Sequence, residues 1–159
     1  MPPLEKRLAR AELLRAQGRY TEAAALLRST LRHASDPLAI ADICNALAVT
    51  YKYTGRFDEA QVLYDRALAI IERVQGPDHV DVASIYHNLG GLAHARGALS
   101  DAERPARRAV DIRVRAVGAG HPDVAADKVR PGGHPRRPRP GRRGRAAHPG
   151  GPGGVRADR

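Results

Sequence analysis

The sequence contains an internal repeat, and this repeat constrains the fold more than any other feature. A shift of 42 residues aligns Gly55 with Gly97 and the segment HVDVA at 79–83 with HPDVA at 121–125. The same shift aligns further small residues, namely Ala60 with Ala102, Ala67 with Ala109 and Gly76 with Gly118. A short repeated unit cannot bury its apolar face alone and is stabilised by stacking on copies of itself. We therefore expect a linear stack of similar units.

Each unit has the pattern of a helix hairpin. In the first half of the unit at 41–83, Ile43, Leu47 and Tyr51 follow the three-and-four spacing of an amphipathic helix. The second half has the same spacing at Ala60, Leu63, Tyr64, Ala67, Leu68 and Ile71. Gly55 lies between the halves, where it can end the first helix in a left-handed conformation. The unit is therefore predicted to be two antiparallel helices.

The residues of this unit resemble those of a known repeat family. The matching positions are Asn45, Leu47, Ala48, Tyr51, Gly55, Arg56, Glu59, Ala60, Tyr64, Ala67 and Leu68. Together with the loop motif, they resemble the tetratricopeptide repeat family in its long form of about 42 residues, found in kinesin-light-chain-like arrays. The resemblance covers about residues 4–129, with repeats at about 4–36, 37–80 and 81–125. It implies an all-α, right-handed superhelix of about three stacked helix hairpins.

The third repeat contains one residue that disagrees with the helix pattern. Pro105 stands at the position of Leu63, several residues inside the expected second helix. A proline there removes a backbone hydrogen bond and clashes with the preceding turn, at a cost of about 3 kcal/mol. We expect a kink or a late helix start, and the least stable of the three hairpins.

The positive charge of the chain is concentrated after the last repeat. Residues 130–159 hold nine arginines and one aspartate, so +8 of the net charge of +10 lies in this segment and +2 in the first 129 residues. The segment contains only Arg, Pro, Gly, His, Ala, Val and Asp, which cannot bury enough apolar surface to offset the entropy of ordering. We expect it to be a disordered basic tail.

Two interpretations of this tail remain open. An arginine-rich arm can bind nucleic acid through its charge, although this one has no aromatic residue on which bases could stack. Alternatively, every residue type in it has a codon beginning with G or C, which is typical of a G+C-rich gene read out of frame. One set of permitted codons, read one base later, gives a further repeat whose turn glycine falls opposite Arg139, 42 residues after Gly97. The chain would then be a truncated fragment of a longer array.

No catalytic, metal or cofactor site is expected from the sequence. His79 with Asp81 and His121 with Asp123 lie in loops that begin a helix, where aspartate is typical of a cap or first turn. Cys44, the single cysteine, falls on an apolar helix stripe and is expected to be buried. No run of about 18 apolar residues or signal peptide is present, so we expect a cytoplasmic protein without membrane contact.

The resemblance implies a non-catalytic protein-interaction module. In this family, peptide or protein segments lie along the concave face formed by the first helix of each hairpin. The positions expected on that face and toward solvent include Arg15, Asn45, Lys52, Tyr53, His87, Asn88 and His94. We expect the asparagines to hydrogen-bond a peptide backbone and the cations to pair with acidic side chains. A nucleic-acid-associated protein acting through the tail is the alternative, and self-association through an uncovered third repeat is also expected.

Overall fold

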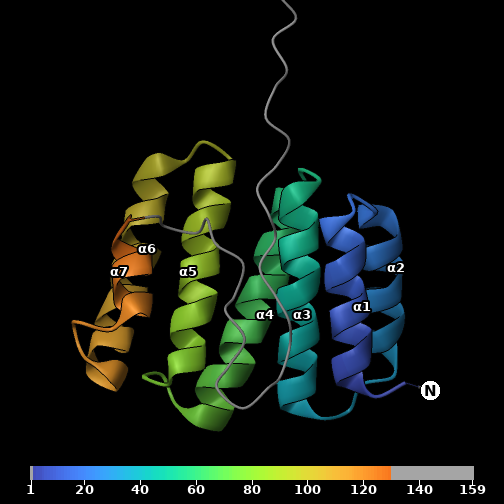
Figure 1. The fold of residues 1–159 in the computed structure, drawn as a ribbon, viewed down its shortest axis with the longest axis horizontal. Coiled ribbons are helices and arrows are strands. Elements are labelled where there is room, and N and C mark those ends of the chain that lie inside the picture. Colours follow the sequence, from blue (N-terminus) through green and yellow to red (C-terminus); the bar gives the residue numbers. More distant parts are fainter. Residues whose placement is uncertain (1, 130–159) are drawn as a thin grey trace, which may run out of the picture.

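The computed structural model describes residues 2–129, which form seven α-helices. Their bounds are α1 Leu4–Ala16, α2 Tyr20–Arg32, α3 Pro37–Tyr53, α4 Phe57–Gln75, α5 Val80–Ala95, α6 Leu99–Val117 and α7 Pro122–Val129. Figure 1 shows them in one row, from α1 and α2 at one end to α6 and α7 at the other. The all-α prediction is confirmed. The tail at 130–159, with both interpretations of it, lies outside the described residues.

Consecutive helices pack against each other, so the chain builds three hairpins followed by one more helix. Within each hairpin the first helix contacts the second, and the second contacts the first helix of the next hairpin. The first helices also contact one another, α1 with α3 and α3 with α5. This arrangement gives one surface made by the first helices of the hairpins and another made by the second helices. We call the surface made by the first helices the α1–α3–α5 face.

Local sequence signals explain where the helices begin and end. Gly55 and Gly97 adopt φ of 75° and 76° two residues after the ends of α3 and α5, a left-handed conformation that glycine takes without strain. The Asp36 side chain accepts a hydrogen bond of 2.8 Å from the Ala39 N–H, and Pro37 occupies the first position of α3. The hairpin turns are therefore encoded by single residues at their ends.

The core is built from aliphatic and small side chains, as the repeat pattern predicts. Ala48, Ala60 and Ala67 are fully buried, and the absence of larger side chains lets α3 and α4 approach closely. Tyr64 and Leu27 are the largest fully buried side chains. One cluster joins residues from α1 through α6, so the hairpins share a continuous core.

Helix α6 differs from the expectation at Pro105. The helix begins at Leu99 and continues through Pro105 to Val117, so the expected late start is wrong. Proline cannot donate to the Asp101 carbonyl four residues earlier, yet the turns on both sides stay helical because their side chains pack on α5. None of the helices within residues 2–129 combines the length and the apolar character needed to cross a membrane.

Candidate functional site

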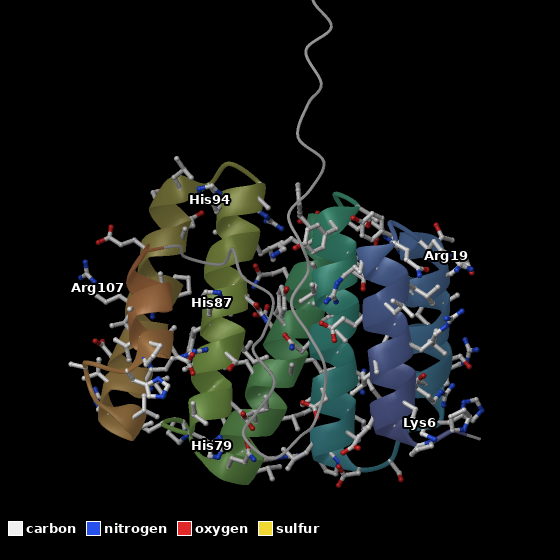
Figure 2. The ribbon with its side chains drawn as sticks, viewed as in Figure 1. Lys6, Arg19, His79, His87, His94 and Arg107 are labelled. Atoms are coloured by element: carbon white, nitrogen blue, oxygen red, sulfur yellow. The ribbon has the colours of Figure 1, made fainter. Side chains whose placement is uncertain are left out.

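The α1–α3–α5 face carries the residues that the repeat register predicts for binding. The structure puts Arg15 at the end of α1, Lys52 and Tyr53 at the end of α3, and His87 and His94 on α5. Figure 2 shows His79, His87 and His94 spaced along α5 from its start to its last turn. These residues therefore come from three helices that lie next to each other.

The two asparagines do not face solvent, which corrects the expectation for them. Asn45 is 6% exposed and Asn88 is 9% exposed. Asn88 Nδ2 donates a hydrogen bond of 2.8 Å to Asn45 Oδ1 across the contact between α3 and α5. Buried amides require such partners, because an unpaired buried polar group is costly. The pair joins two repeats, and the hydrogen bond occupies the amide donor of Asn88 and the carbonyl acceptor of Asn45.

A cationic and aromatic cluster lies where α1 and α3 end. Tyr53 is 56% exposed and stacks on Tyr20, with ring centroids 5.9 Å apart and an interplanar angle of 12°. Lys52 Nζ lies 5.2 Å from the centroid of the Tyr53 ring. We call Arg15, Tyr20, Lys52 and Tyr53 the Lys52 cluster. It offers a positive group beside an exposed aromatic ring.

The electrostatics of the Lys52 cluster favour an anionic neighbour. Burial of Lys52 lowers its pKa below the ordinary lysine value, and the nearby positive charge of Arg15 lowers it further. Both effects oppose the charged form of the amine. Two cations thus lie on this part of the α1–α3–α5 face, and their charge attracts acidic groups.

The two histidines on α5 lie farther along the same face. His87 is half-buried, whereas His94 is exposed in the last turn of α5. Near the start of α5, Arg113 from α6 reaches Ser84 Oγ at 3.3 Å. The role of the two histidines in binding stays a prediction.

The histidines of the repeated loop act as helix caps. His79 Nδ1 accepts a hydrogen bond of 3.1 Å from the Asp81 N–H, and His121 Nδ1 accepts one of 3.2 Å from the Asp123 N–H. Within the part of the chain that the structure describes, no group of three or more potential ligands could hold a metal ion. The structural interpretation of the two histidine and aspartate pairs therefore accounts for their geometry.

Cys44 is fully buried in the shared core. Burial raises the pKa of its thiol, which keeps the sulfur protonated and weakly nucleophilic. Its packing role is the one expected from the helix stripe.

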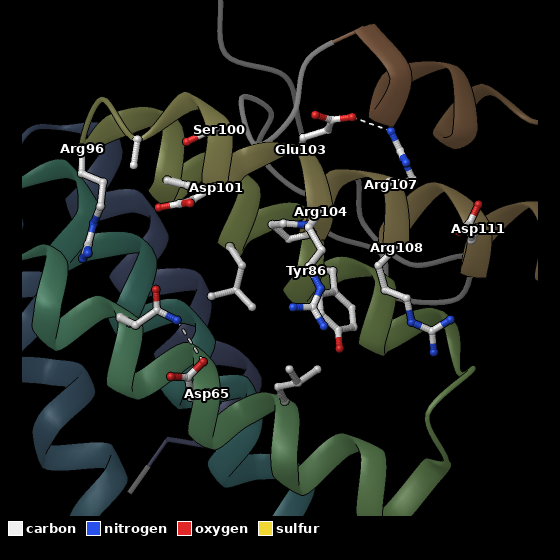
Figure 3. Close-up of a pocket in the computed structure, with 16 residues that line it drawn as sticks. Asp65, Tyr86, Arg96, Ser100, Asp101, Glu103, Arg104, Arg107, Arg108 and Asp111 are labelled. Carbon is white, nitrogen blue, oxygen red and sulfur yellow. Dashed lines mark hydrogen bonds and ion pairs between the residues drawn. The ribbon is translucent and has the colours of Figure 1, made fainter.

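A groove on the opposite side of the molecule was not anticipated. It lies between α4 and α6, with α5 beneath it, and has a cavity volume of about 830 Å³. Figure 3 shows charged residues around it, among them Asp65, Arg96, Asp101 and Arg104. Sequence patterns for single helices do not reveal such a groove, because its lining comes from α4, α5 and α6 together.

Comparison with known proteins agrees with this architecture. A family model described as tetratricopeptide repeat matches residues 38–126, and a second tetratricopeptide repeat model matches residues 8–40. The crystal structure of BtubC (BKLC) from P. vanneervenii is similar with a TM-score of 0.64 and 27% sequence identity, over 74% of this chain and 48% of that chain.

Two proteins of Arabidopsis thaliana are also similar in sequence. Protein KINESIN LIGHT CHAIN-RELATED 2 is 34% identical over 84 residues, which are 53% of this chain and 12% of that protein. Protein KINESIN LIGHT CHAIN-RELATED 3 is 29% identical over 111 residues, which are 70% of this chain and 17% of that protein. This chain thus spans a small part of the curated relatives it matches. Because the match at residues 38–126 covers more than half of the 159 residues, the chain belongs to the tetratricopeptide repeat family.

Proposed function

We propose that the chain is a non-catalytic protein-interaction module that binds a peptide or protein segment along the α1–α3–α5 face. Tetratricopeptide repeat domains generally bind proteins, and this face gathers the first helices of three consecutive hairpins. The observation that supports this face most strongly is the Lys52 cluster, in which an exposed ring lies beside two mutually repelling cations.

The chemistry of the Lys52 cluster indicates what kind of segment fits. Tyr53 can contact an apolar or aromatic side chain through its exposed ring, and Lys52 with Arg15 can pair with a carboxylate. His87 and His94 would contact the part of the segment nearer α5. The hydrogen bond between Asn45 and Asn88 fixes the spacing of α3 and α5 beneath the ligand.

The test combines photocrosslinking with matched substitutions. A photoreactive phenylalanine replaces Tyr53 in one variant of the full chain and Val62, an exposed residue of α4, in the other. Proteins crosslinked at position 53 and absent at position 62 are identified and purified. Their affinity is then measured for Lys52→Glu and Tyr53→Ala, with Arg66→Glu on α4 as the charge control.

The proposal requires that Lys52→Glu and Tyr53→Ala each weaken binding by about tenfold while Arg66→Glu does not. Deletion of residues 130–159 should leave the affinity unchanged. If that deletion alone abolishes binding, the tail and not the α1–α3–α5 face carries the interaction.

A further inference from the structure

The valley between α2 and α4 is filled by an aromatic ring and two cations. Tyr51 belongs to α3, which lies beneath this valley, and its side chain is 5% exposed. Arg28 of α2 donates a hydrogen bond of 3.2 Å to Tyr51 Oη, and the Arg56 guanidinium lies 4.0 Å from the centroid of the Tyr51 ring. The valley is therefore closed by side chains of the chain itself.

The next valley, between α4 and α6, lacks all three groups. The repeat register places Asp65 where Arg28 stands, Ala93 where Tyr51 stands and Ala98 where Arg56 stands. Asp65, Ala93 and Ala98 all line the groove of about 830 Å³. The groove is thus the space that a ring and its cationic neighbours occupy one repeat earlier. We call it the α4–α6 groove.

The inner lining of the α4–α6 groove is apolar. Leu68 comes from α4, Leu89 and Ala93 from α5, and Pro105 from α6. Arg104 and Tyr86 lie in the middle of the groove in Figure 3. An aromatic side chain entering from outside would contact aliphatic carbon below, and the Arg104 guanidinium could stack on its face as Arg56 does on Tyr51.

The charges around the groove are unequally paired. Three of its arginines form ion pairs, Arg96 with Asp58 at 3.4 Å, Arg108 with Asp78 at 3.2 Å and Arg107 with Glu103. In contrast, the lining carboxylates Asp65, Asp101 and Asp111 form no ion pair among residues 2–129. Among the four lining arginines, Arg104 alone forms no ion pair with a residue of this range. The unpaired charge is therefore mainly negative.

We propose that the α4–α6 groove binds an aromatic side chain of a partner protein that is flanked by lysine or arginine. The ring occupies the volume that Tyr51 fills one repeat earlier, and the flanking cations meet Asp65, Asp101 and Asp111. Apolar burial of the ring provides most of the affinity, because exposed ion pairs contribute little individually. The carboxylates select basic over acidic segments. This second binding surface is separate from the α1–α3–α5 face and does not depend on it.

The experiment uses the full chain labelled with ¹⁵N and three synthetic peptides. The peptides are acetylated and amidated Gly-Lys-Phe-Lys-Gly, Gly-Lys-Ala-Lys-Gly and Gly-Glu-Phe-Glu-Gly. A single ring and two exposed charges predict a dissociation constant on the order of a millimolar for the first peptide. Its binding should shift the amide signals of Asp65, Leu89 and Asp101. The alanine peptide should bind about tenfold more weakly, because the buried ring is missing.

Two sets of variants test the groove itself. Ala93→Tyr with Ala98→Arg restores the groups that fill the α2–α4 valley, so this variant should lose binding of the phenylalanine peptide. Ala25→Tyr with Ala69→Arg adds the same groups at exposed positions outside the groove and should retain it. The triple variant Asp65→Asn with Asp101→Asn and Asp111→Asn should abolish the preference for the lysine-flanked over the glutamate-flanked phenylalanine peptide. This test remains decisive if the variant Ala93→Tyr with Ala98→Arg fails to fold.

Three results would overturn the groove as the binding site for the ring, and a fourth would overturn the charge selection. One is a set of shifts confined to the α1–α3–α5 face, and another is equal binding of the phenylalanine and alanine peptides. The third is a change in the amide signals of the groove residues when the protein concentration is raised without peptide, because a second copy of the chain would then occupy the groove. An unchanged charge preference in the triple asparagine variant would overturn the assignment of the flanking cations.

Discussion

Asn88 on α5 donates its side-chain amide to Asn45 on α3 across 2.8 Å, and both residues are buried between two consecutive repeats. Asn88→Ala leaves the Asn45 carbonyl oxygen without this donor. The free energy of unfolding should fall by about 1–3 kcal/mol. The double variant Asn45→Ala with Asn88→Ala should lose less than the sum of the two single losses, which a denaturant-based double-mutant cycle measures. Additive losses would contradict a direct coupling between the two amides.

Pro105→Leu should stabilise the third hairpin. Leucine restores an N–H that can donate to the Asp101 carbonyl, and it is the residue found at the equivalent position 63. The free energy of unfolding should increase by about 1–3 kcal/mol. Pro77→Leu, in the turn before α5, is the control and should change stability little. The proline interpretation fails if the two variants have the same melting temperature.

Removing the charge of Arg15 should raise the pKa of Lys52 toward the ordinary lysine value, because Arg15 lowers it in the native protein. The ¹³Cε signal of Lys52 reports this titration in Arg15→Gln. Arg19→Gln is the control, since Arg19 pairs with Glu22 at 2.6 Å and is no cause of the Lys52 shift. Equal Lys52 titrations in the two variants would contradict the role of Arg15.

The same shift predicts how stability depends on pH. The pKa of Lys52 is lower in the folded protein than in the unfolded chain, so between the two values the unfolded chain binds more protons. The Lys52 contribution to the free energy of unfolding therefore increases as pH rises through this window. Chemical denaturation from neutral to alkaline pH should show a steeper increase for the native chain than for Lys52→Met.

Amide hydrogen exchange should be graded along the array. Residues 43–68 have neighbouring hairpins on both sides, whereas beyond Ala109 the described contacts are with α5 and with the eight-residue helix α7. Exchange should therefore be slowest in α3 and α4 and faster at the end of α6. Val117 is exposed there, and self-association through this end would slow its exchange as protein concentration rises. Uniform protection in a dilute monomer would contradict a less stable C-terminal hairpin.

The sequence predicted the hairpins well because each carries its own signals. Gly55 and Gly97 mark turns, and the spacing from Ala60 to Ile71 defines a buried stripe without knowledge of any neighbour. The two asparagines were misplaced because position within one helix does not reveal how closely the next repeat approaches. Their burial depends on the contact between α3 and α5.

The α4–α6 groove was missed for a related reason. Its origin is the replacement of Tyr51 by Ala93 between one repeat and the next, and alanine fits a helix pattern as well as tyrosine does. Pro105 was a different case. The late helix start expected there does not occur, because packing on α5 holds the helix together across the missing hydrogen bond.

The contacts of the array join each helix to its immediate neighbours or to the next helix but one. Within residues 2–129 these contacts do not require two distant segments to meet across a long loop, so folding can start in any hairpin and spread in both directions. The same locality makes the length of the array adjustable. An in-frame duplication of the 42 residues from 38 to 79 would insert one more hairpin, whose two ends already match the surfaces on either side. The molecule can thus be lengthened by copying without redesign of the parts that remain.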